Sequence, residues 1–314
     1  MKEVNYIQEI NKLRKEKNAI ILAHYYQTGD IQDIADFVGD SLALAQKAEK
    51  NKASIIIVAG VKFMAETVKI ITPEKKVIIP DLEAGCSLAD SCKPEDFEKF
   101  IKKYPGSKII SYINTTAEIK AMSDIICTSS NAVKIIESFP ENDKIIFAPD
   151  RNMGDYIEKK TGRNLIIWDG ACHVHEKFSL EEVLSLKQKY PDAKVIVHPE
   201  CERTIRNIAD FIGSTSALIE FTLYDKGKSY IVATEPGVLH QMMKLNRHKK
   251  FIPVPIDNSS FKLNECNYMK LITVEKIYES LINERYEIMI DEEIINKASQ
   301  SVMKMIEISK KLGL

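Results

Sequence analysis

The segment AIILAHYYQTGDIQDIADFVGDS (19–41) decides the fold, because the chain repeats its pattern twice more without gaps. The second copy is SKIISYINTTAEIKAMSDIICTS (107–129), and the third is AKVIVHPECERTIRNIADFIGST (193–215). The first and third copies share the run IADF, followed in both by an aliphatic residue and a glycine. Self-similarity at a fixed period is the signature of related structural units. The sequence therefore predicts three units of similar structure.

Each copy begins with an apolar, β-branched run, and two more such runs follow before the next copy starts. The nine runs cover residues 19–25, 54–60, 76–81, 108–113, 144–150, 164–170, 194–200, 229–234 and 250–255. Continuous Val and Ile runs separated by segments of helical period are typical of buried parallel strands. We therefore predict an α/β fold of three pseudo-threefold-related units. Each is a three-layer αβα unit with a short parallel sheet of three strands.

The expected unit boundaries follow these runs. Residues 1–85 form the first unit, 86–171 the second and 172–266 the third. Residues 267–314 have the pattern of amphipathic helices, with apolar residues three and four positions apart. We expect these C-terminal helices, and an N-terminal helix at about residues 3–17, to pack back on the first unit. Their apolar stripes could instead form a dimer face, so the chain is expected to be a monomer or a homodimer.

The composition excludes several classes of protein. The 314 residues carry 44 Lys and Arg against 45 Asp and Glu, a formal net charge of −1. This balance argues against a general nucleic-acid binder, which normally has a basic excess. No apolar run approaches the ~20 residues that cross a bilayer, and the charged N-terminal stretch lacks the apolar core of a signal peptide. We expect a cytoplasmic globular protein that binds neither nucleic acid nor a membrane.

Three of the six cysteines lie in equivalent loops, each after the last strand of a unit. KVIIPDLEAGC ends at Cys86, NLIIWDGAC at Cys172 and KFIPVPIDNSSFKLNEC at Cys266. Three thiolates around a threefold axis suit a [4Fe-4S] cluster in which one iron has no protein ligand and can act as a Lewis acid. The alternative is that they are buried core thiols. The cysteines without such equivalence, which we predict to be non-ligands, are Cys92, Cys127 and Cys201.

Polar residues gather at the carboxyl end of the first strand of each unit. The end positions are His24, Tyr112 and His198, and two residues later follow Tyr26, Asn114 and Glu200. Side chains two apart lie on the same face of an extended chain, and parallel sheets bind ligands beyond the carboxyl ends of their strands. We therefore predict one central cleft lined by these side chains. Glu200 is the only carboxylate among them and a neighbour of His198, so it is the predicted general base.

A hydroxyl residue recurs where a helix is expected to begin in each unit. These residues are Ser41, Ser129 and Thr215. We predict that each is the N-cap of its helix, and the free N–H groups of a helix start also bind carboxylate or phosphate oxygens. Three such positions around one cleft indicate a small polyanionic substrate. The chain has no GxGxxG after a strand and no GxxxxGKS or GxxxxGKT, so a nucleotide cofactor is not indicated.

Ten motifs follow one another over nearly the whole chain. They are HYYQ (24–27), IADFVGDS (34–41), PDLEAGCSLADSC (80–92), SYINTTAEIKAMSD (111–124), CTSSNA (127–132), APDRNMG (148–154), GACHVHEKF (170–178), HPEC (198–201), GSTS (213–216) and ATEPGV (233–238). With these motifs the chain resembles quinolinate synthase, the A protein family of NAD biosynthesis. The resemblance implies a central active site with an oxygen-sensitive [4Fe-4S] cluster, held by Cys86, Cys172 and Cys266, with one open iron.

The resemblance also implies a reaction. A condensing transferase of this family joins iminoaspartate (iminosuccinate) and dihydroxyacetone phosphate, and releases phosphate and water as quinolinate forms. An aspartate oxidase or dehydrogenase, in transient contact, would supply the first substrate. The family's substrate-binding positions carry over onto His24, Ser41, Tyr112, Asn114, Ser129, His198, Glu200 and Thr215. The predicted catalytic residues are Glu200, His198, Tyr112 and Tyr26.

Two other interpretations stay open at this point. Reductive dehydroxylases of the isoprenoid pathway and diphthamide-forming radical enzymes also use three related units with one cysteine each. A non-enzymatic iron or oxygen sensor could bind a cluster as well, although it has no need of six polar groups and three anion sites around it. Turnover with the two substrates separates these interpretations.

Overall fold

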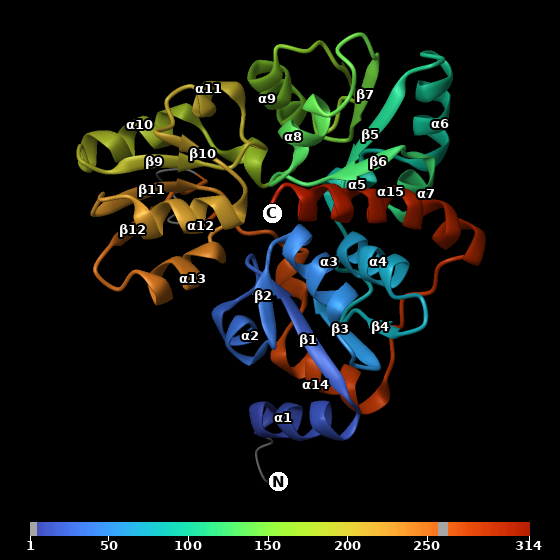
Figure 1. Ribbon diagram of the computed structural model, residues 1–314. Helices are drawn as coiled ribbons and strands as arrows, with labels where there is room; N and C mark the ends of the chain where they lie inside the picture. The colour runs from blue at the N-terminus through green and yellow to red at the C-terminus, as the bar shows by residue number, and fades with distance from the viewer. Residues whose placement is uncertain (1–4, 257–262) are drawn as a thin grey trace.

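The computed structural model describes residues 5–256 and 263–314 and contains three units built on one plan (Figure 1). Each unit holds a four-stranded sheet in which all pairings are parallel. The sheet orders are β2-β1-β3-β4, β6-β5-β7-β8 and β10-β9-β11-β12. The order is the same in every unit, which confirms the α/β fold with three related units.

The strands are short and lie where the apolar runs predicted them. The first sheet comprises β1 Ala19–His24, β2 Phe37–Gly39, β3 Ile55–Ala59 and β4 Lys76–Ile78. The second comprises β5 Lys108–Tyr112, β6 Ile125–Cys127, β7 Ile145–Ala148 and β8 Ile166–Ile167. The third comprises β9 Lys194–Val197, β10 Phe211–Ile212, β11 Ser229–Ala233 and β12 Lys250–Pro253.

Helices connect the strands and cover the sheets. Around the first sheet they are α1 Tyr6–Glu16, α2 Gly29–Ile34, α3 Ser41–Lys50 and α4 Lys62–Ile71. Around the second they are α5 Ser87–Asp90, α6 Pro94–Lys102, α7 Ala117–Met122, α8 Ala132–Glu137 and α9 Arg151–Thr161. The third has α10 Leu180–Lys189, α11 Arg203–Arg206, α12 Thr215–Tyr224 and α13 Val238–Leu245, and the chain ends with α14 Val274–Asn283 and α15 Glu292–Lys311.

The repeat is visible in single hydrogen bonds. In the first unit, the Asp36 carboxylate accepts a bond from the Ile21 N–H at 2.8 Å, and the Asp36 N–H donates to the Ile21 carbonyl at 2.9 Å. The equivalent Asp124 and Asp210 make the same two bonds to the first strands of their units, at 2.7 and 2.8 Å. One aspartate per unit therefore ties the loop before the second strand to the first strand.

The prediction of three strands per unit is wrong by one. All nine predicted strands are present, each shorter than predicted, but β2, β6 and β10 add an edge strand to every sheet. These strands have only two or three residues and lie inside segments of helical period. The segment 33–50, for example, divides among α2, β2 and α3. A periodicity window is longer than such a strand, so it averages the strand into its helical neighbours.

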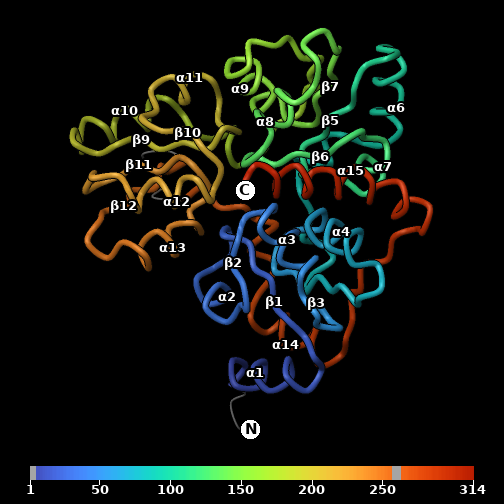
Figure 2. Tube along the Cα trace, viewed as in Figure 1, coloured from blue at the N-terminus to red at the C-terminus, as the bar shows by residue number. Residues whose placement is uncertain are grey.

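The two terminal helices of the C-terminal segment differ in what they cover. α14 packs on α1 and β3 of the first unit, as expected. α15 instead lies between the first and second units, against α4, α7 and β6 (Figures 1 and 2). Its Ser301 donates to the Lys120 carbonyl of the second unit at 2.7 Å, and its Lys310 pairs with Glu49 of the first at 2.8 Å. α15 therefore contacts the second unit as well as the first.

The apolar faces of these helices lie inside the chain's own core. Ile277 and Leu281 of α14 and Val302 and Met305 of α15 are fully buried, in one cluster with the sheets of the first two units. The N-terminal helix begins at Tyr6, and residues 3 and 4 of its predicted range lie outside the described residues. Burial of apolar side chains is the main stabilising contribution of such terminal helices.

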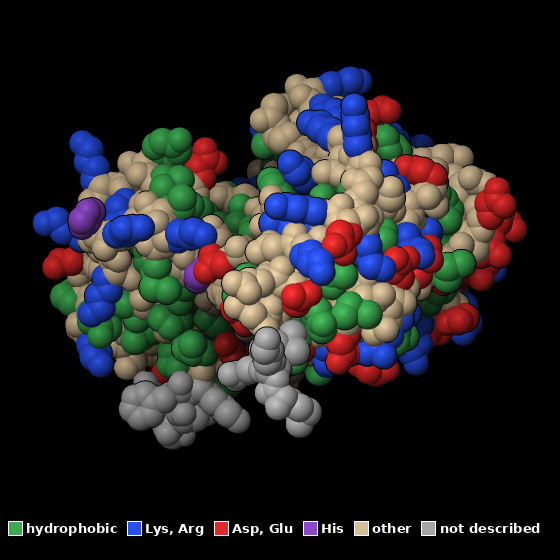
Figure 3. Space-filling model, turned by 90° about the horizontal axis from the view of Figure 1, so that it is seen from below, with side chains coloured by type: hydrophobic (Ala, Val, Ile, Leu, Met, Phe, Trp, Pro, Cys, Tyr) green, Lys and Arg blue, Asp and Glu red, His purple; other side chains and the backbone are tan. Residues whose placement is uncertain are grey.

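Within 5–256 and 263–314, no helix combines the length and apolarity that a membrane span requires. On the face drawn in Figure 3, basic and acidic side chains are intermixed over the surface. This mixture agrees with the formal net charge of −1.

Candidate functional site

The carboxyl ends of the three first strands meet at one pocket. All twelve predicted site residues line it: His24, Tyr26, Ser41, Cys86, Tyr112, Asn114, Ser129, Cys172, His198, Glu200, Thr215 and Cys266. Each copy of the repeat, taken together with the cysteine that follows its last strand, contributes four of them, so the pocket lies at the junction of the repeat. The structure thus brings together every residue that the patterns singled out, and the role of each stays a prediction.

The three equivalent cysteines differ from the other three in exposure. Cys86, Cys172 and Cys266 are half-buried and line the pocket, whereas Cys92, Cys127 and Cys201 are fully buried. Burial raises the pKa of Cys86 to about 12, and the nearby Cys266 thiol adds to the rise. Burial also raises the pKa of Cys266 to about 11. A metal would have to displace the protons of these thiols, as ligation by thiolate requires.

The thiols lie close enough to affect one another electrostatically. The rise in the pKa of Cys172 comes first from burial, then from Glu200 and from Cys86. Cys86 therefore interacts with both of the other pocket thiols. Three such thiols from three loops form a soft donor set of the kind that binds iron–sulfur clusters.

At His24 and at His198, a backbone N–H two residues later donates a hydrogen bond to the imidazole. We call each of these strand ends with its following turn a corner of the pocket. The Tyr26 N–H donates to His24 Nδ1 at 3.1 Å, and the Glu200 N–H donates to His198 Nδ1 at 3.4 Å. β1 ends at His24 and β9 one residue before His198, so Tyr26 and Glu200 lie in the turns that follow these strands. The predicted strand alternation is therefore the wrong reason for their shared orientation. The hydrogen bond between the turn and the imidazole brings the side chain of Tyr26 or Glu200 to the pocket.

Both imidazoles are neutral at physiological pH. Burial lowers the pKa of His24 to about 4, although Asp40 and Glu200 oppose the shift. Burial lowers the pKa of His198 to about 3. Because Nδ1 accepts a hydrogen bond in each ring, the neutral tautomer carries its proton on Nε2.

Glu200 is a buried acid whose carboxylate is in contact with two side chains of the site. The Tyr112 hydroxyl donates to its Oε1 at 2.6 Å, and His175 Nδ1 lies 2.9 Å from its Oε2. Burial alone would raise the pKa of Glu200, but His175 and His198 and the two hydrogen bonds outweigh burial and lower it. Glu200 is therefore an ionised carboxylate, only 3% exposed, that faces groups from two units.

A second set of hydrogen bonds joins the opposite corner to His175. The Tyr26 hydroxyl lies 2.9 Å from Thr234 Oγ1 and 3.0 Å from Thr215 Oγ1. Thr234 Oγ1 in turn lies 3.0 Å from His175 Nε2. Together with the Glu200 contacts, these bonds form one continuous chain of polar side chains through all three units. Such a chain can hold and pass protons without bulk water.

The predicted N-caps are one residue or more away from the observed ones. Asp40 caps α3 by accepting from the Ala43 N–H at 3.0 Å, and Ser214 caps α12 by accepting from the Ala217 N–H at 3.2 Å. Ser41 and Thr215 are therefore the first residues of their helices, with hydroxyls that line the pocket instead of capping. Ser129 precedes α8 by three residues, and the N-cap there is Asn131.

The capping residues also join the units beside the pocket. The Ser130 hydroxyl of the second unit lies 3.1 Å from Asp40 Oδ2 and 2.9 Å from the Ser214 hydroxyl. Ser216 of the third unit donates to the same Asp40 oxygen at 2.6 Å. One carboxylate of the first unit is thus bound by hydroxyls of both other units, which fixes the three helix starts around the pocket.

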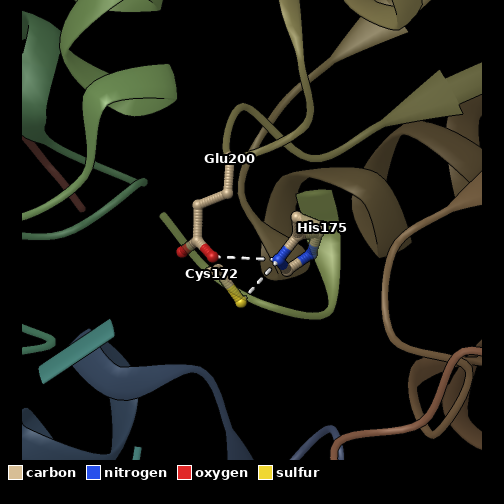
Figure 4. Close-up of side chains that lie close together, drawn as sticks. All are labelled: Cys172, His175 and Glu200. Atoms are coloured by element: carbon tan, nitrogen blue, oxygen red, sulfur yellow. Dashed lines mark hydrogen bonds and ion pairs between the residues drawn. The ribbon is translucent and has the colours of Figure 1, made fainter. Parts of the chain in front are cut away.

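Cys172, His175 and Glu200 form a group that could hold a metal ion (Figure 4). Their ligand atoms lie within 4.8 Å of one another. His175 Nδ1 stands between the other two, 2.9 Å from Glu200 Oε2 and 3.3 Å from Cys172 Sγ. These distances are those of hydrogen bonds, which orient the imidazole toward the thiol.

Several residues of the site had no predicted role. They are Asp40, His175, Thr234 and Glu235, and all are buried. His175 lies three residues after Cys172, within the motif GACHVHEKF, and Thr234 and Glu235 follow the carboxyl end of β11. Their positions after a strand or a ligand loop were visible in the sequence. Their partners lie up to 208 residues away and were not.

Comparisons with known proteins give one consistent result. A family model described as "Quinolinate synthetase A protein" matches residues 8–307. The chain is 55% identical over 300 residues to a quinolinate synthase of Microcystis aeruginosa, a match that covers 96% of this chain and 94% of the relative. It is 54% identical to one of Synechocystis over the same shares of both chains. A third, from Chloroherpeton thalassium, is 50% identical over 99% of this chain and 96% of its own length.

Proposed function

This chain belongs to the quinolinate synthetase A protein family, and from that membership we propose that it condenses iminoaspartate with dihydroxyacetone phosphate to form quinolinate. In this reaction one C–C and one C–N bond form, the C–O bond to phosphate breaks, and two molecules of water leave. The atoms and electrons balance without an oxidant or a reductant. The chain therefore needs proton transfer, charge stabilisation and help with dehydration.

The observation that carries the proposal is the convergence at the pocket. Three equivalent strand ends bring one half-buried cysteine, one hydroxyl residue and a pair of further polar residues each to a single cavity. Buried polar groups are costly unless they are hydrogen-bonded, and here they are gathered around one cavity and bonded to one another. Such a cavity suits a small substrate with several oxygen atoms.

We assign the [4Fe-4S] cluster to Cys86, Cys172 and Cys266. The donor set fits, because these are the half-buried thiols of the chain and Cys86 interacts with both others. When bound, such a cluster leaves one iron without a protein ligand, and that iron supplies Lewis-acid chemistry. His175, which reaches both Cys172 and Glu200, would orient one ligand loop toward the acid–base groups.

Glu200 is proposed as the general base. It is ionised, buried and in contact with the hydroxyl of Tyr112 and the imidazole of His175, each of which can exchange a proton with it. A carboxylate with two such neighbours can remove a proton from substrate carbon and return it to a leaving hydroxyl. His198 and Tyr26 would serve as neutral donors, since burial lowers the pKa of His198 and raises the pKa of Tyr26.

Substrate oxygens are proposed to bind at the helix starts. Ser41 and Thr215 are the first residues of α3 and α12, and Ser129 lies in the turn before α8. Their hydroxyls line the pocket, and the N-termini of α3 and α12 add a favourable field for anions. Two carboxylates and one phosphate match these positions in number. His24 and Asn114 complete the proposed binding set.

The proposed cellular setting follows the substrates. We place the protein in the cytoplasm, where an aspartate oxidase or dehydrogenase would deliver iminoaspartate by transient contact. Light scattering distinguishes the two proposed oligomeric states, monomer and homodimer.

A turnover assay tests the function. The protein is purified and reconstituted without oxygen, supplied with dihydroxyacetone phosphate and freshly generated iminoaspartate, and quinolinate is measured by chromatography. Quinolinate should form only when both substrates are present. If the reconstituted protein contains iron yet makes no quinolinate, the reaction is another one, such as a reductive dehydroxylation or a radical step, or the protein is a sensor.

A further inference from the structure

The three cysteine loops are tied to their units in two different ways. In the first unit, the Lys62 N–H donates to the Ala84 carbonyl at 2.7 Å, two residues before Cys86. In the second unit, the Arg151 N–H donates to the Gly170 carbonyl at 2.8 Å, two residues before Cys172. Both loops are therefore held by a backbone bond from the residue that begins the helix after the third strand.

The third unit cannot make this bond. The sheet registers pair Ala59 with Ala23, Ala148 with Ser111 and Ala233 with Val197. Counting three residues onward from these equivalent alanines leads to Lys62, Arg151 and Pro236. Proline has no backbone N–H. Pro236 therefore cannot hold the loop of Cys266 in the way that the other two units hold theirs.

A side chain takes over this contact in the third unit. Glu235 is fully buried, and its Oε1 accepts a hydrogen bond from the Cys266 N–H at 3.2 Å. Its Oε2 accepts from the Gly237 N–H at 2.6 Å, which fixes the carboxylate against its own turn. Lys270 Nζ lies 2.8 Å from Oε1 and also donates to the Tyr26 carbonyl at 2.6 Å. The ion pair thus connects the Cys266 loop to the third and first units.

The position of Glu235 holds residues with other roles in the first and second units. In the first unit it is Val61, which has no polar side chain. In the second it is Asp150, whose carboxylate accepts from the Met153 N–H at 2.8 Å and caps α9. Among the described residues, a carboxylate bonded to the backbone N–H of a pocket cysteine occurs at Glu235 alone. The contact therefore belongs to the third unit and not to the shared frame.

We propose that Glu235, held in place by Lys270, is a positioning residue that fixes Cys266 at the pocket in place of the backbone bond that Pro236 precludes. The inference rests on the proposed function in so far as Cys266 serves as a cluster ligand. Fixing the loop lowers the disorder that ligation would otherwise have to remove. The contact is made by the chain's own residues, so it can also be tested without a cluster.

Site-specific alkylation of the full, metal-free chain tests the contact. The native protein is treated with iodoacetamide, and labelling of each cysteine is followed by mass spectrometry over time. Glu235→Ala should speed labelling of Cys266 about tenfold relative to Cys86. Glu235→Gln removes the same charge but keeps an acceptor oxygen, so Cys266 should be labelled at close to the wild-type rate.

Two controls separate positioning from general loosening. Cys201 is a fully buried thiol of the same unit, and its labelling should not change in Glu235→Ala. Glu182→Ala removes another buried glutamate of the third unit, in α10, and should leave Cys266 unchanged. Equal acceleration at Cys201, or unchanged labelling of Cys266 in Glu235→Ala, would overturn the proposal.

A second measurement separates this inference from the proposed function. After anaerobic reconstitution, iron loss to a chelator should be about tenfold faster from Glu235→Ala than from wild type and Glu235→Gln. Wild-type chain that takes up no iron, with the alkylation pattern as predicted, would refute the cluster and leave the positioning role intact. Stable iron in wild type and Glu235→Ala alike, with unchanged labelling, would refute the positioning role alone.

Discussion

In the first unit, β1 ends at His24, whose Nδ1 accepts from the Tyr26 N–H; in the third, His198 accepts in the same way from Glu200. Burial lowers the pKa of both imidazoles. The two corners differ in the second residue, which is a phenol in one and a carboxylate in the other. The repeated strand end and turn place a side chain at the pocket in each unit. The identity of that side chain determines whether the corner can act as a base.

The largest loss of turnover is expected when the Glu200 carboxylate is replaced. Glu200→Gln keeps the size of the side chain but lowers its basicity, so quinolinate formation should fall by about 10²- to 10⁴-fold. The measurement is the turnover rate of the reconstituted enzyme with both substrates. Iron per chain should stay at the wild-type value, which separates a lost base from a lost cluster. Near-normal turnover would remove Glu200 from the mechanism.

The aspartate hydrogen bonds that the units share can be removed one unit at a time and their effects on stability compared. Asp36→Ala and Asp210→Ala each leave one first-strand N–H without its carboxylate acceptor. Each should therefore lower the free energy of unfolding by about 1–3 kcal/mol. Chemical denaturation of the two variants compares the units directly. A large cost in one unit and none in the other would show that the units do not share this tie.

The phenol corner should matter less than the carboxylate corner. Tyr26→Phe removes a hydroxyl that touches Thr215 and Thr234 but leaves Glu200 in place. We expect turnover to fall about tenfold, as for the loss of one or two hydrogen bonds in a transition state. The same assay measures it, with Tyr190→Phe, outside the pocket lining, as the control. A loss as large as that of Glu200→Gln would erase the distinction between the corners.

The smallest expected effect is a pH dependence of stability. The pKa of His24 is about 4 in the fold against 6.5 in the unfolded chain, so the unfolded chain binds the proton more readily. The contribution of His24 is complete above pH 6.5 and is lost as the pH falls toward 4. Between pH 7 and about pH 5.5, His24→Gln should reduce the loss of unfolding free energy by about 1 kcal/mol. Parallel stability curves for both proteins would contradict this.

Much of this comparison could be predicted from the sequence. Three ungapped copies and three equivalent cysteines predict the units, the pocket and its lining, because each copy encodes its own strand end. The bonds that join the corners could not be predicted in this way. Tyr112 and Glu200 lie 88 residues apart, and Tyr26 and Thr234 lie 208 apart. Those contacts depend on how the units dock, which no local pattern encodes.

The errors in predicting the edge strands, the helix caps and the place of α15 had a different origin. β2, β6 and β10 are too short for a periodicity window, and the true cap of α3 is Asp40 because its carboxylate, not the hydroxyl of Ser41, reaches the free N–H. The place of α15 between two units depends on apolar side chains that could cover either unit. In each case tertiary packing decided between local alternatives of similar cost.

Three equivalent loops are proposed to hold one cluster, with one cysteine each. Iron and sulfide per chain, measured after anaerobic reconstitution of wild type and of single Cys→Ala variants, test it most directly. We predict about four irons per chain in wild type and in Cys127→Ala, and loss of the cluster in Cys86→Ala, Cys172→Ala and Cys266→Ala. One metal ion per chain that depends on Cys172, His175 and Glu200 but not on Cys86 or Cys266 would contradict the account.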